Sequence, residues 1–209
     1  FVTKLSESIV ELAEDNGGFL SIRSVGVSSP SGNFKTGCIE NSPNMKWKGV
    51  IPMAAMLRDR LGIAVALGND SHTMALGEHV YGSAHGMRDF VLVTLGHGLG
   101  NAIFNRGKII LGAHGFGGEM GHSCVVDGGR LCGCGNHGCL EAYCATKGVV
   151  QTAKELMEES GEESLMTIYP NLTPKNITEC CNKGDKLAIE TYRRTGHILG
   201  IAMANIAAL

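Results

Sequence analysis

The chain has 209 residues, enough for one large domain or two small ones with a sizeable core. Its net charge is −2, with 18 basic against 20 acidic residues, so the charge balance gives no support for nucleic-acid binding. We find neither a signal peptide nor a run of about 18 apolar residues that predicts a membrane span. Small molecules and other subunits are therefore the expected partners.

The first half of the chain predicts helices that alternate with strands. Apolar residues at helical spacing predict a helix over 1–16, which two glycines then end. The polar residues 29–49, with proline, glycine and asparagine, predict a long loop. The other elements expected here are strands over 21–28 and 64–70, a helix over 50–62, and a helix from 71 to about Tyr81.

The second half begins with the apolar stretch 90–96, which predicts a strand. The next two segments predict a hairpin joined near Arg106 and Gly107. Glycine-dense residues 112–138 predict irregular chain, and the pattern is helical from Cys139 onward, including a helix near 174–182 and a long one from about Asp185. The chain starts at Phe1 and stops inside that last helix, so we expect an internal part of a longer α/β protein.

Three cysteines lie close together in the sequence CGCGNHGCLE: Cys132, Cys134 and Cys139. Tetrahedral zinc requires four ligands, and thiolates at this spacing with glycines between them are typical of a structural zinc site. The fourth ligand predicted from spacing is His122, His137 or Cys144. The alternative is unmetallated thiols or one disulfide, and a Cys-x-Cys disulfide is disfavoured because its ring would be small and strained. Eight cysteines without a secretion signal favour a reducing cytoplasm.

A polar pair, Asn69 and Asp70, ends an apolar strand and opens a helix. The structural interpretation is that Asp70 caps the helix, and this observation alone favours it over a functional role. The functional interpretation is a general base at the carboxyl end of a strand, where α/β proteins bind ligands.

The glycine-rich turn GHGLGN (96–101) follows the strand at 90–96. Its backbone N–H groups suit phosphate oxygens. A tight hairpin would have the same glycine-rich sequence, so the sequence favours the two interpretations equally. Farther along, Glu119 and Glu141 flank the cysteine cluster, and a carboxylate in such a stretch suits the hydroxyls of a polyol.

The motifs GND with ALGE (68–78), TLGHGLGNAI (94–103), GFGGEMGH (115–122) and CGCGNHGCLE (132–141) occur in this order. Together they resemble the ROK family of repressors, open reading frames and sugar kinases, over about residues 21–146. The resemblance implies an actin-like, hexokinase-type ATPase fold of two α/β domains, truncated at both ends here. We expect residues 1–87 to belong to the smaller N-terminal domain, and residues 88–209 to the larger C-terminal domain with the zinc site.

The resemblance also implies the residues of a glucokinase-like site. Asp70 is the catalytic base, and His122 is the fourth zinc ligand as well as a sugar ligand. The other implied hexose ligands are Asn69, Glu119, Glu141, and, from the segments SSPSGN and SPNM, Ser31, Gly32 and Asn44. The implied second phosphate loop for ATP contains Thr94, Gly96, His97, Gly98 and Gly100.

The expected reaction is transfer of the ATP γ-phosphate to a hexose hydroxyl, at C6, with Mg²⁺ on the phosphates and zinc in a purely structural role. The family's first phosphate loop and its adenosine motif do not occur among these residues, so we expect this chain alone not to complete an ATP site. His97 stands where family kinases usually carry threonine, which bears on turnover. The resemblance further suggests a homodimer.

Two other functions compete with the kinase. A sugar-responsive repressor of the same family would keep the sugar and zinc sites and add a basic winged helix. A zinc-stabilised assembly module would explain the cysteines but not Asp70, Glu119 and Glu141. The presence of Asp70 favours the kinase, and the sequence does not identify the hexose.

Overall fold

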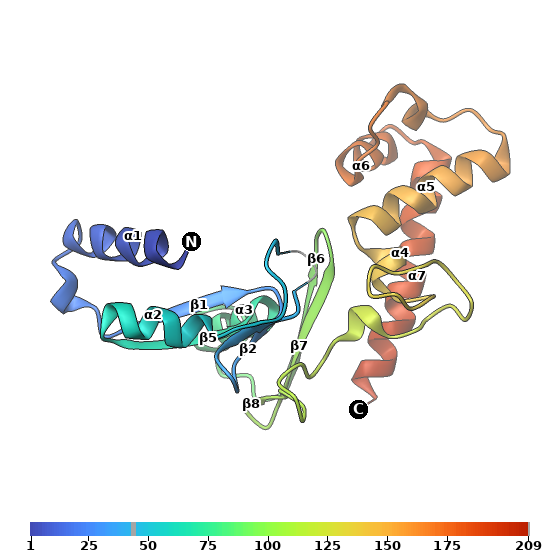
Figure 1. Cartoon of the computed structure of the whole chain (residues 1–209). Helices are drawn as coiled ribbons and strands as arrows, with labels where there is room; N and C mark the ends of the chain where they lie inside the picture. The colour runs from blue at the N-terminus through green and yellow to red at the C-terminus, as the bar shows by residue number, and fades with distance from the viewer. Residues whose placement is uncertain (43–44, 209) are drawn as a thin grey trace. The chain divides into compact units, whose positions relative to one another are not determined.

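Strands β1 (Ser24–Ser29) and β5 (Ala64–Asn69) pair in parallel in the computed structural model of the chain (Figure 1). The structure describes residues 1–42 and 45–208. The pairing runs in register to Ser29 opposite Asn69, so the carboxyl ends of both strands lie together. This edge carries the polar pair that the sequence singles out.

The chain divides into two compact units. Unit 1 comprises Phe1–Leu92 and Ala102–Gly118, and unit 2 comprises Val93–Asn101 and Glu119–Leu209. The expected division into domains at residues 87 and 88 stays a prediction. The strand pair β6 (Phe90–Leu95) and β7 (Leu99–Asn105) contributes residues to both units.

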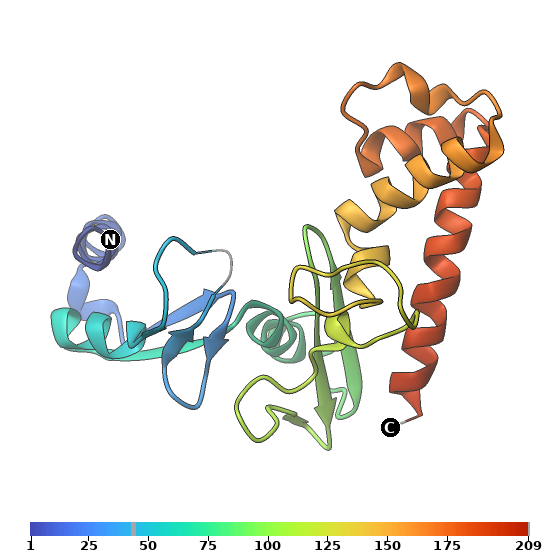
Figure 2. The same ribbon diagram turned by 45° about the vertical axis from the view of Figure 1, so that its right-hand side comes forward.

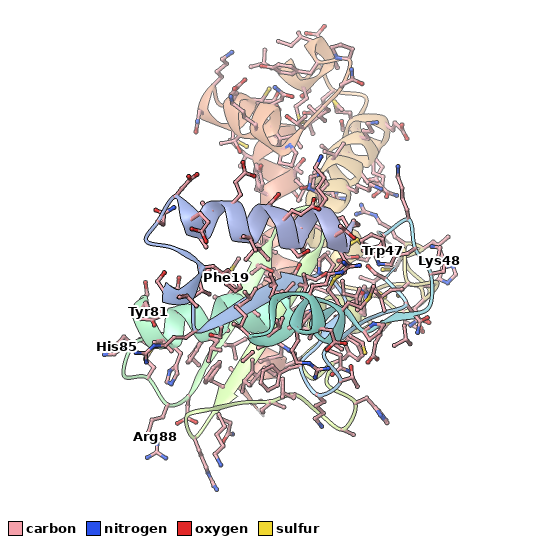
Figure 3. All side chains as sticks on the ribbon, turned by 60° about the vertical axis from the view of Figure 1, so that its left-hand side comes forward. Phe19, Trp47, Lys48, Tyr81, His85 and Arg88 are labelled. Carbon is pink, nitrogen blue, oxygen red and sulfur yellow. The ribbon has the colours of Figure 1, made fainter. Side chains whose placement is uncertain are left out.

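In the core of unit 1, helix α2 (Met53–Leu61) packs against both α1 (Val2–Glu14) and β5. Apolar side chains at helical and strand spacing face inward, and Leu57 and Leu67 are 0% and 2% exposed. Phe19, in the 3₁₀ turn η1 (Phe19–Ser21), and Trp47 pack against this core from the periphery (Figure 3). The remaining buried members of the core are Val2, Ile39, Met53 and Leu61.

The segment 29–49 is not a plain loop, and this part of the sequence prediction is wrong. It holds the short strands β2 (Gly32–Asn33) and β3 (Cys38–Glu40), which form an antiparallel sheet with β4 (Val50–Ile51). Strands of two or three residues are too short to produce a visible alternation of apolar and polar residues.

Unit 1 also contains helix α3 (Asp70–Tyr81), which begins one residue earlier than predicted and ends at the predicted residue. It ends at Tyr81, which is 91% exposed (Figure 3). The predicted hairpin is confirmed as well, because β7 pairs with β8 (Lys108–Ile109) through Arg106 and Gly107, both at positive φ.

Unit 2 is mainly helical beyond its irregular segment. Helices α5 (Thr146–Ser160) and α7 (Lys186–Ala207) pack against each other (Figures 1 and 2). The shorter elements are η2 (Met120–His122), α4 (Glu141–Cys144), η3 (Leu165–Ile168) and α6 (Pro174–Asn182). The predicted helices near 174–182 and from Asp185 are confirmed. No helix in the described part of the chain combines the length and hydropathy of a membrane span.

Candidate functional site

Asp70 lies at the first position of α3, directly after the carboxyl end of β5. The helix is capped by Asn69, whose Oδ1 accepts from the N–H of Ser71 at 2.9 Å. The interpretation of Asp70 as the cap is therefore wrong. Asp70 is exposed, and its Oδ1 also accepts from the same N–H, at 2.8 Å. The neighbouring residue thus does the capping, which leaves the Asp70 carboxylate at the surface.

The turn before β2 lies against the end of β5. A Cβ on Gly32 would collide with the carbonyl of Gly68, whose carbon would be only 2.7 Å away, and would lie 2.9 Å from the carbonyl oxygen of Ser29. Ser31 has φ of 56°, in the left-handed region, which turns the chain here. Gly32 therefore lies against Gly68, the residue before Asn69. Asn44 lies outside the described residues.

Three side chains of unit 1 that no sequence motif marks hold the glycine-rich loop at 112–117. Asn33, 2% exposed, donates to the carbonyl of His114 at 2.8 Å. Lys35 Nζ donates to the carbonyls of Gly112 and Ala113, at 2.7 and 3.0 Å. His72 Nε2 lies 2.9 Å from the carbonyl of Gly117. These contacts order the loop that leads to Glu119.

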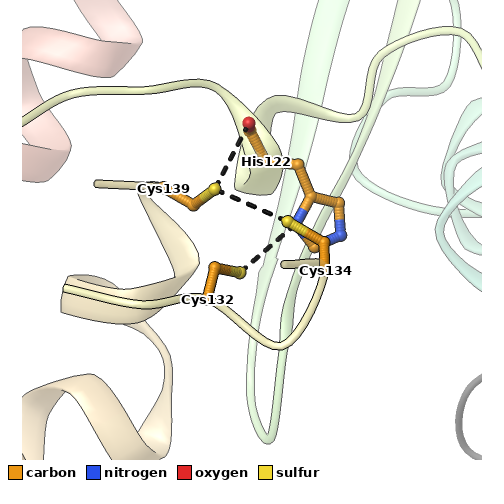
Figure 4. Close-up of side chains that lie close together, drawn as sticks. All are labelled: His122, Cys132, Cys134 and Cys139. Atoms are coloured by element: carbon orange, nitrogen blue, oxygen red, sulfur yellow. Dashed lines mark hydrogen bonds between the residues drawn. The ribbon is translucent and has the colours of Figure 1, made fainter. Parts of the chain in front are cut away.

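In unit 2, the predicted metal ligands lie together (Figure 4). The ligand atoms of His122, Cys132, Cys134 and Cys139 all lie within 4.8 Å of one another. Cys134 Sγ is 3.7 Å from Cys139 Sγ, and Cys132 Sγ is 3.7 Å from His122 Nδ1. Ligands of a tetrahedral zinc ion with Zn–S bonds of about 2.3 Å are separated by about 3.8 Å, so this donor set fits zinc.

The other two candidates for the fourth ligand lie elsewhere. The Cys144 thiol is buried and donates to the carbonyl of Thr195 at 3.6 Å. His137 is exposed and forms a β-bridge with Leu131. Of the three alternatives left open by spacing, His122 is the one whose side chain reaches the cysteines.

The thiols of the cluster differ in their tendency to ionise. Burial and the thiols of Cys134 and Cys132 raise the pKa of Cys139 to about 12. The N–H of Asn136 lowers the pKa of Cys134. A metal binds thiolates and displaces their protons, so its affinity for this cluster increases with pH.

The GEMGH motif packs against the end of the GHGLGN loop. The N–H of Met120 donates to Asn101 Oδ1 at 2.8 Å, and a Cβ on Gly121 would collide with the carbonyl of Leu99. Glu119 precedes η2 and is exposed, and its carbonyl accepts from the N–H of His122 at 3.1 Å. The close backbone approach at Gly121 is a reason for glycine in this motif.

Glu141, the first residue of α4, joins the cysteine cluster to the GHGLGN loop. Its Oε2 accepts from the N–H of Leu99 at 2.8 Å, and its Oε1 lies 4.0 Å from Cys132 Sγ. A Cβ on Gly98 would lie 2.7 Å from Oε2. Glu141 is therefore half-buried and held between the loop and the metal ligands.

The GHGLGN loop is the tight turn between β6 and β7. The N–H of Gly96 donates to the carbonyl of Gly98 at 3.0 Å. The carbonyl of Gly96 accepts from both the N–H and the hydroxyl of Thr146. His97 is exposed at the tip, and Thr94 lies on β6. The hairpin interpretation is confirmed, and phosphate binding by the same turn stays a prediction.

The family model described as the ROK family matches residues 2–209. The chain belongs to the ROK family. The match extends well beyond the span of the sequence motifs, to both ends of the chain.

Curated relatives include both ROK enzymes and ROK regulators. The chain is 32% identical to a glucokinase of Halalkalibacterium halodurans over 188 residues, which are 88% of this chain and 57% of the relative. It is 35% identical to the DNA-binding transcriptional dual regulator NagC of Escherichia coli over 148 residues, 71% of this chain and 36% of the relative. The chain thus spans about half the length of the curated relatives it matches, or less.

Solved structures of the ROK family share the fold. A ROK transcriptional regulator, a homologue of the E. coli MLC protein, superposes with a TM-score of 0.85 at 26% identity, covering 98% of this chain and 52% of the other. A Streptomyces griseus glucokinase in complex with glucose and AMPPNP has a TM-score of 0.77 at 28% identity, covering 99% and 68%. The expected α/β, actin-like ATPase fold is confirmed.

Proposed function

We propose that this ROK protein is an ATP-dependent hexose kinase. The observation that carries the proposal is the exposed carboxylate of Asp70 at the joined carboxyl ends of β1 and β5, in a chain 32% identical to glucokinases. Ligands of open α/β sheets bind at this edge. Because Asn69 caps α3, the Asp70 carboxylate is available to accept a proton.

In the proposed reaction, Asp70 takes the proton from a sugar hydroxyl, at C6, as that oxygen attacks the γ-phosphorus of ATP in line. The bond from the γ-phosphorus to the bridging oxygen breaks, and ADP leaves. Mg²⁺ bound with ATP would neutralise the phosphate charge. The turn of the GHGLGN loop, with Thr94 before it, offers backbone N–H groups to the phosphates.

The proposed hexose ligands are the residues that the ROK motifs supply: Asn69, Ser31, Gly32, Glu119, His122 and Glu141. Carboxylates accept hydrogen bonds from sugar hydroxyls. Zinc held by the three cysteines would fix His122 through Nδ1 and leave Nε2 for the sugar.

The test is an ATP-coupled assay of the full-length protein with a panel of hexoses and N-acetylhexosamines, with Asp70→Asn as the matched variant. We expect turnover of one or more sugars, and a loss of kcat of about 10²–10⁴-fold in Asp70→Asn with hexose affinity retained. Hexose binding without turnover by the wild type would reject the kinase.

His97 gives a second arm of the same assay. Its imidazole is exposed at the tip of the proposed phosphate loop, where ROK kinases usually have threonine. We expect His97→Thr to raise kcat, because the smaller side chain leaves more room for a phosphate. An unchanged kcat would show that the imidazole does not limit turnover.

A sugar-responsive repressor is the second candidate. The identity to NagC and the superposition on the MLC homologue favour it specifically. A repressor would bind a hexose at the same residues and change its affinity for DNA instead of phosphorylating the sugar. A DNA-binding assay of the full-length protein with and without the bound hexose, beside the kinase assay, separates the two.

A further inference from the structure

Arg130, two residues before the first clustered cysteine, is held almost entirely inside unit 2. Its side chain is 11% exposed. Nη1 donates to the carbonyls of Ala142 and Gly148, both at 3.1 Å, and Nη2 donates to Thr152 Oγ1 at 2.9 Å. The two carboxylate oxygens of Glu155, on α5, accept hydrogen bonds from Nε and Nη2. One guanidinium therefore joins the start of α4 to α5.

The backbone of Arg130 belongs to the cysteine segment. Its carbonyl accepts from the N–H of Gly138 at 2.8 Å, and its N–H donates to the hydroxyl of Tyr143 at 2.9 Å. The guanidinium also lies over the Tyr143 ring, 4.5 Å from its centre. Arg130 thus links the segment that carries the metal ligands to both helices.

Helix α4 depends on such contacts for its position. It has four residues, too few to be stable alone, and its last carbonyls lack partners within the helix. Arg130 supplies a donor to Ala142, the residue after Glu141. The orientation of the Glu141 side chain follows from the placement of this short helix.

We propose that Arg130 is a positioning residue for hexose binding, because it fixes the helix start that presents Glu141. This inference rests on the proposed hexose site. Arginine is required here because one planar guanidinium donates at once to two carbonyls, a hydroxyl and a carboxylate, which an ammonium group cannot do. The role is separate from that of the metal, since none of the guanidinium contacts involves a metal ligand.

The test compares Arg130→Lys with the wild type in the full-length protein. Hexose affinity is measured by calorimetry without ATP, bound metal by elemental analysis, and KM and kcat by the coupled assay. The matched control is Arg194→Lys in the same unit, whose side chain is 45% exposed and pairs with Glu159 and Glu190.

We expect Arg130→Lys to weaken hexose binding and raise KM by about tenfold, with kcat changed much less and the metal content per chain unchanged. The control is expected to match the wild type in all three. Unchanged hexose affinity in Arg130→Lys, measured well below its melting temperature, would overturn the proposal even if that temperature falls.

Thr152→Val covers the case in which Arg130→Lys does not fold, because it removes one of the contacts and leaves the guanidinium. We expect a smaller loss of hexose affinity in the same direction, and no loss overturns the proposal. Hexose binding without turnover by the wild type rejects the kinase alone, whereas no hexose binding at all rejects the hexose site and this inference with it.

Discussion

The carboxylate of Glu141 and the backbone N–H of Leu99 are joined by a hydrogen bond of 2.8 Å. The bond connects a proposed sugar ligand to the turn proposed to hold phosphate. Because Gly98 has no Cβ, the carboxylate can lie directly beneath the turn. A change at the turn is therefore transmitted to the sugar ligand.

Gly98→Ala tests this link. The new Cβ would lie 2.7 Å from Glu141 Oε2, so the carboxylate must move, and we expect hexose affinity to fall by about tenfold in calorimetry. The control is Gly200→Ala on α7, where nothing lies within 4 Å. It should bind hexose as the wild type does and stabilise the helix by about 1 kcal/mol.

Cys134→Ser tests the coupling of metal and sugar. The substitution removes one thiolate of the cluster, so we expect less zinc in elemental analysis and a weaker hexose affinity, because the His122 ring loses its anchor. Cys181→Ser, outside the cluster, should change neither measurement. Full hexose affinity in a metal-depleted Cys134→Ser protein would show that His122 is positioned without the ion.

Gly32→Ala tests the contact between the β2 turn and the end of β5. The added methyl group meets backbone atoms of Gly68 and Ser29, which cannot rotate away, so we expect a loss of about 1–3 kcal/mol in the free energy of unfolding. Gly26→Ala in β1 is the matched control, because its Cβ would enter open space. Denaturant unfolding that shows equal stability for the two variants would contradict this packing.

Asp185→Asn tests the charge at the start of α7. Asp185 is 8% exposed and accepts from the N–H groups of Ala188 and Leu165 and from the Ser164 hydroxyl, at 2.9, 2.6 and 2.8 Å. Burial raises the pKa of this carboxyl, but these hydrogen bonds outweigh burial and hold the pKa below its usual 3.8. The ionised form is therefore the one that stabilises the fold.

The sign of the pH dependence follows from this lowered pKa. The stabilisation is complete above about pH 4 and disappears as the pH falls through the pKa of the folded state. We expect Asp185→Asn to cost about 1–2 kcal/mol at pH 7 in denaturant unfolding, and the difference from the wild type to shrink below about pH 4. Asp127→Asn, at an exposed position of the same unit, should show no such difference.

The predictable parts of the fold are those with a local signal. The bounds of α3, the hairpin at Arg106 and Gly107, and the helices of unit 2 follow from periodicity and turn chemistry. The sequence does not predict the β2–β3 pairing. These strands have only two or three residues, and their position depends on contact with the end of β5.

The candidate site is also only partly predictable from the sequence. The cysteine spacing predicts a metal cluster but does not identify its fourth ligand. The fold places His122 beside the cysteines, whereas the Cys144 thiol donates to the carbonyl of Thr195. Arg130 has no signal in the sequence beyond its place beside the cysteines, since a single arginine is usually a solvated surface residue. Its partners are 12 to 25 residues farther along the chain and meet it only in three dimensions.

Because Asn69 caps α3, positions 69 and 70 should differ in the substitutions that they tolerate. Serine, threonine, aspartate and asparagine all cap helices through a side-chain oxygen, so the helix alone would accept any of them at position 69. Asparagine keeps an NH₂ donor after its oxygen has accepted from the Ser71 N–H, and serine and threonine would keep an O–H donor, whereas aspartate would keep none. In a scan of all substitutions, position 69 should therefore tolerate aspartate for folding but not for sugar binding, and position 70 should tolerate many residues for folding and none for the proposed phosphoryl transfer.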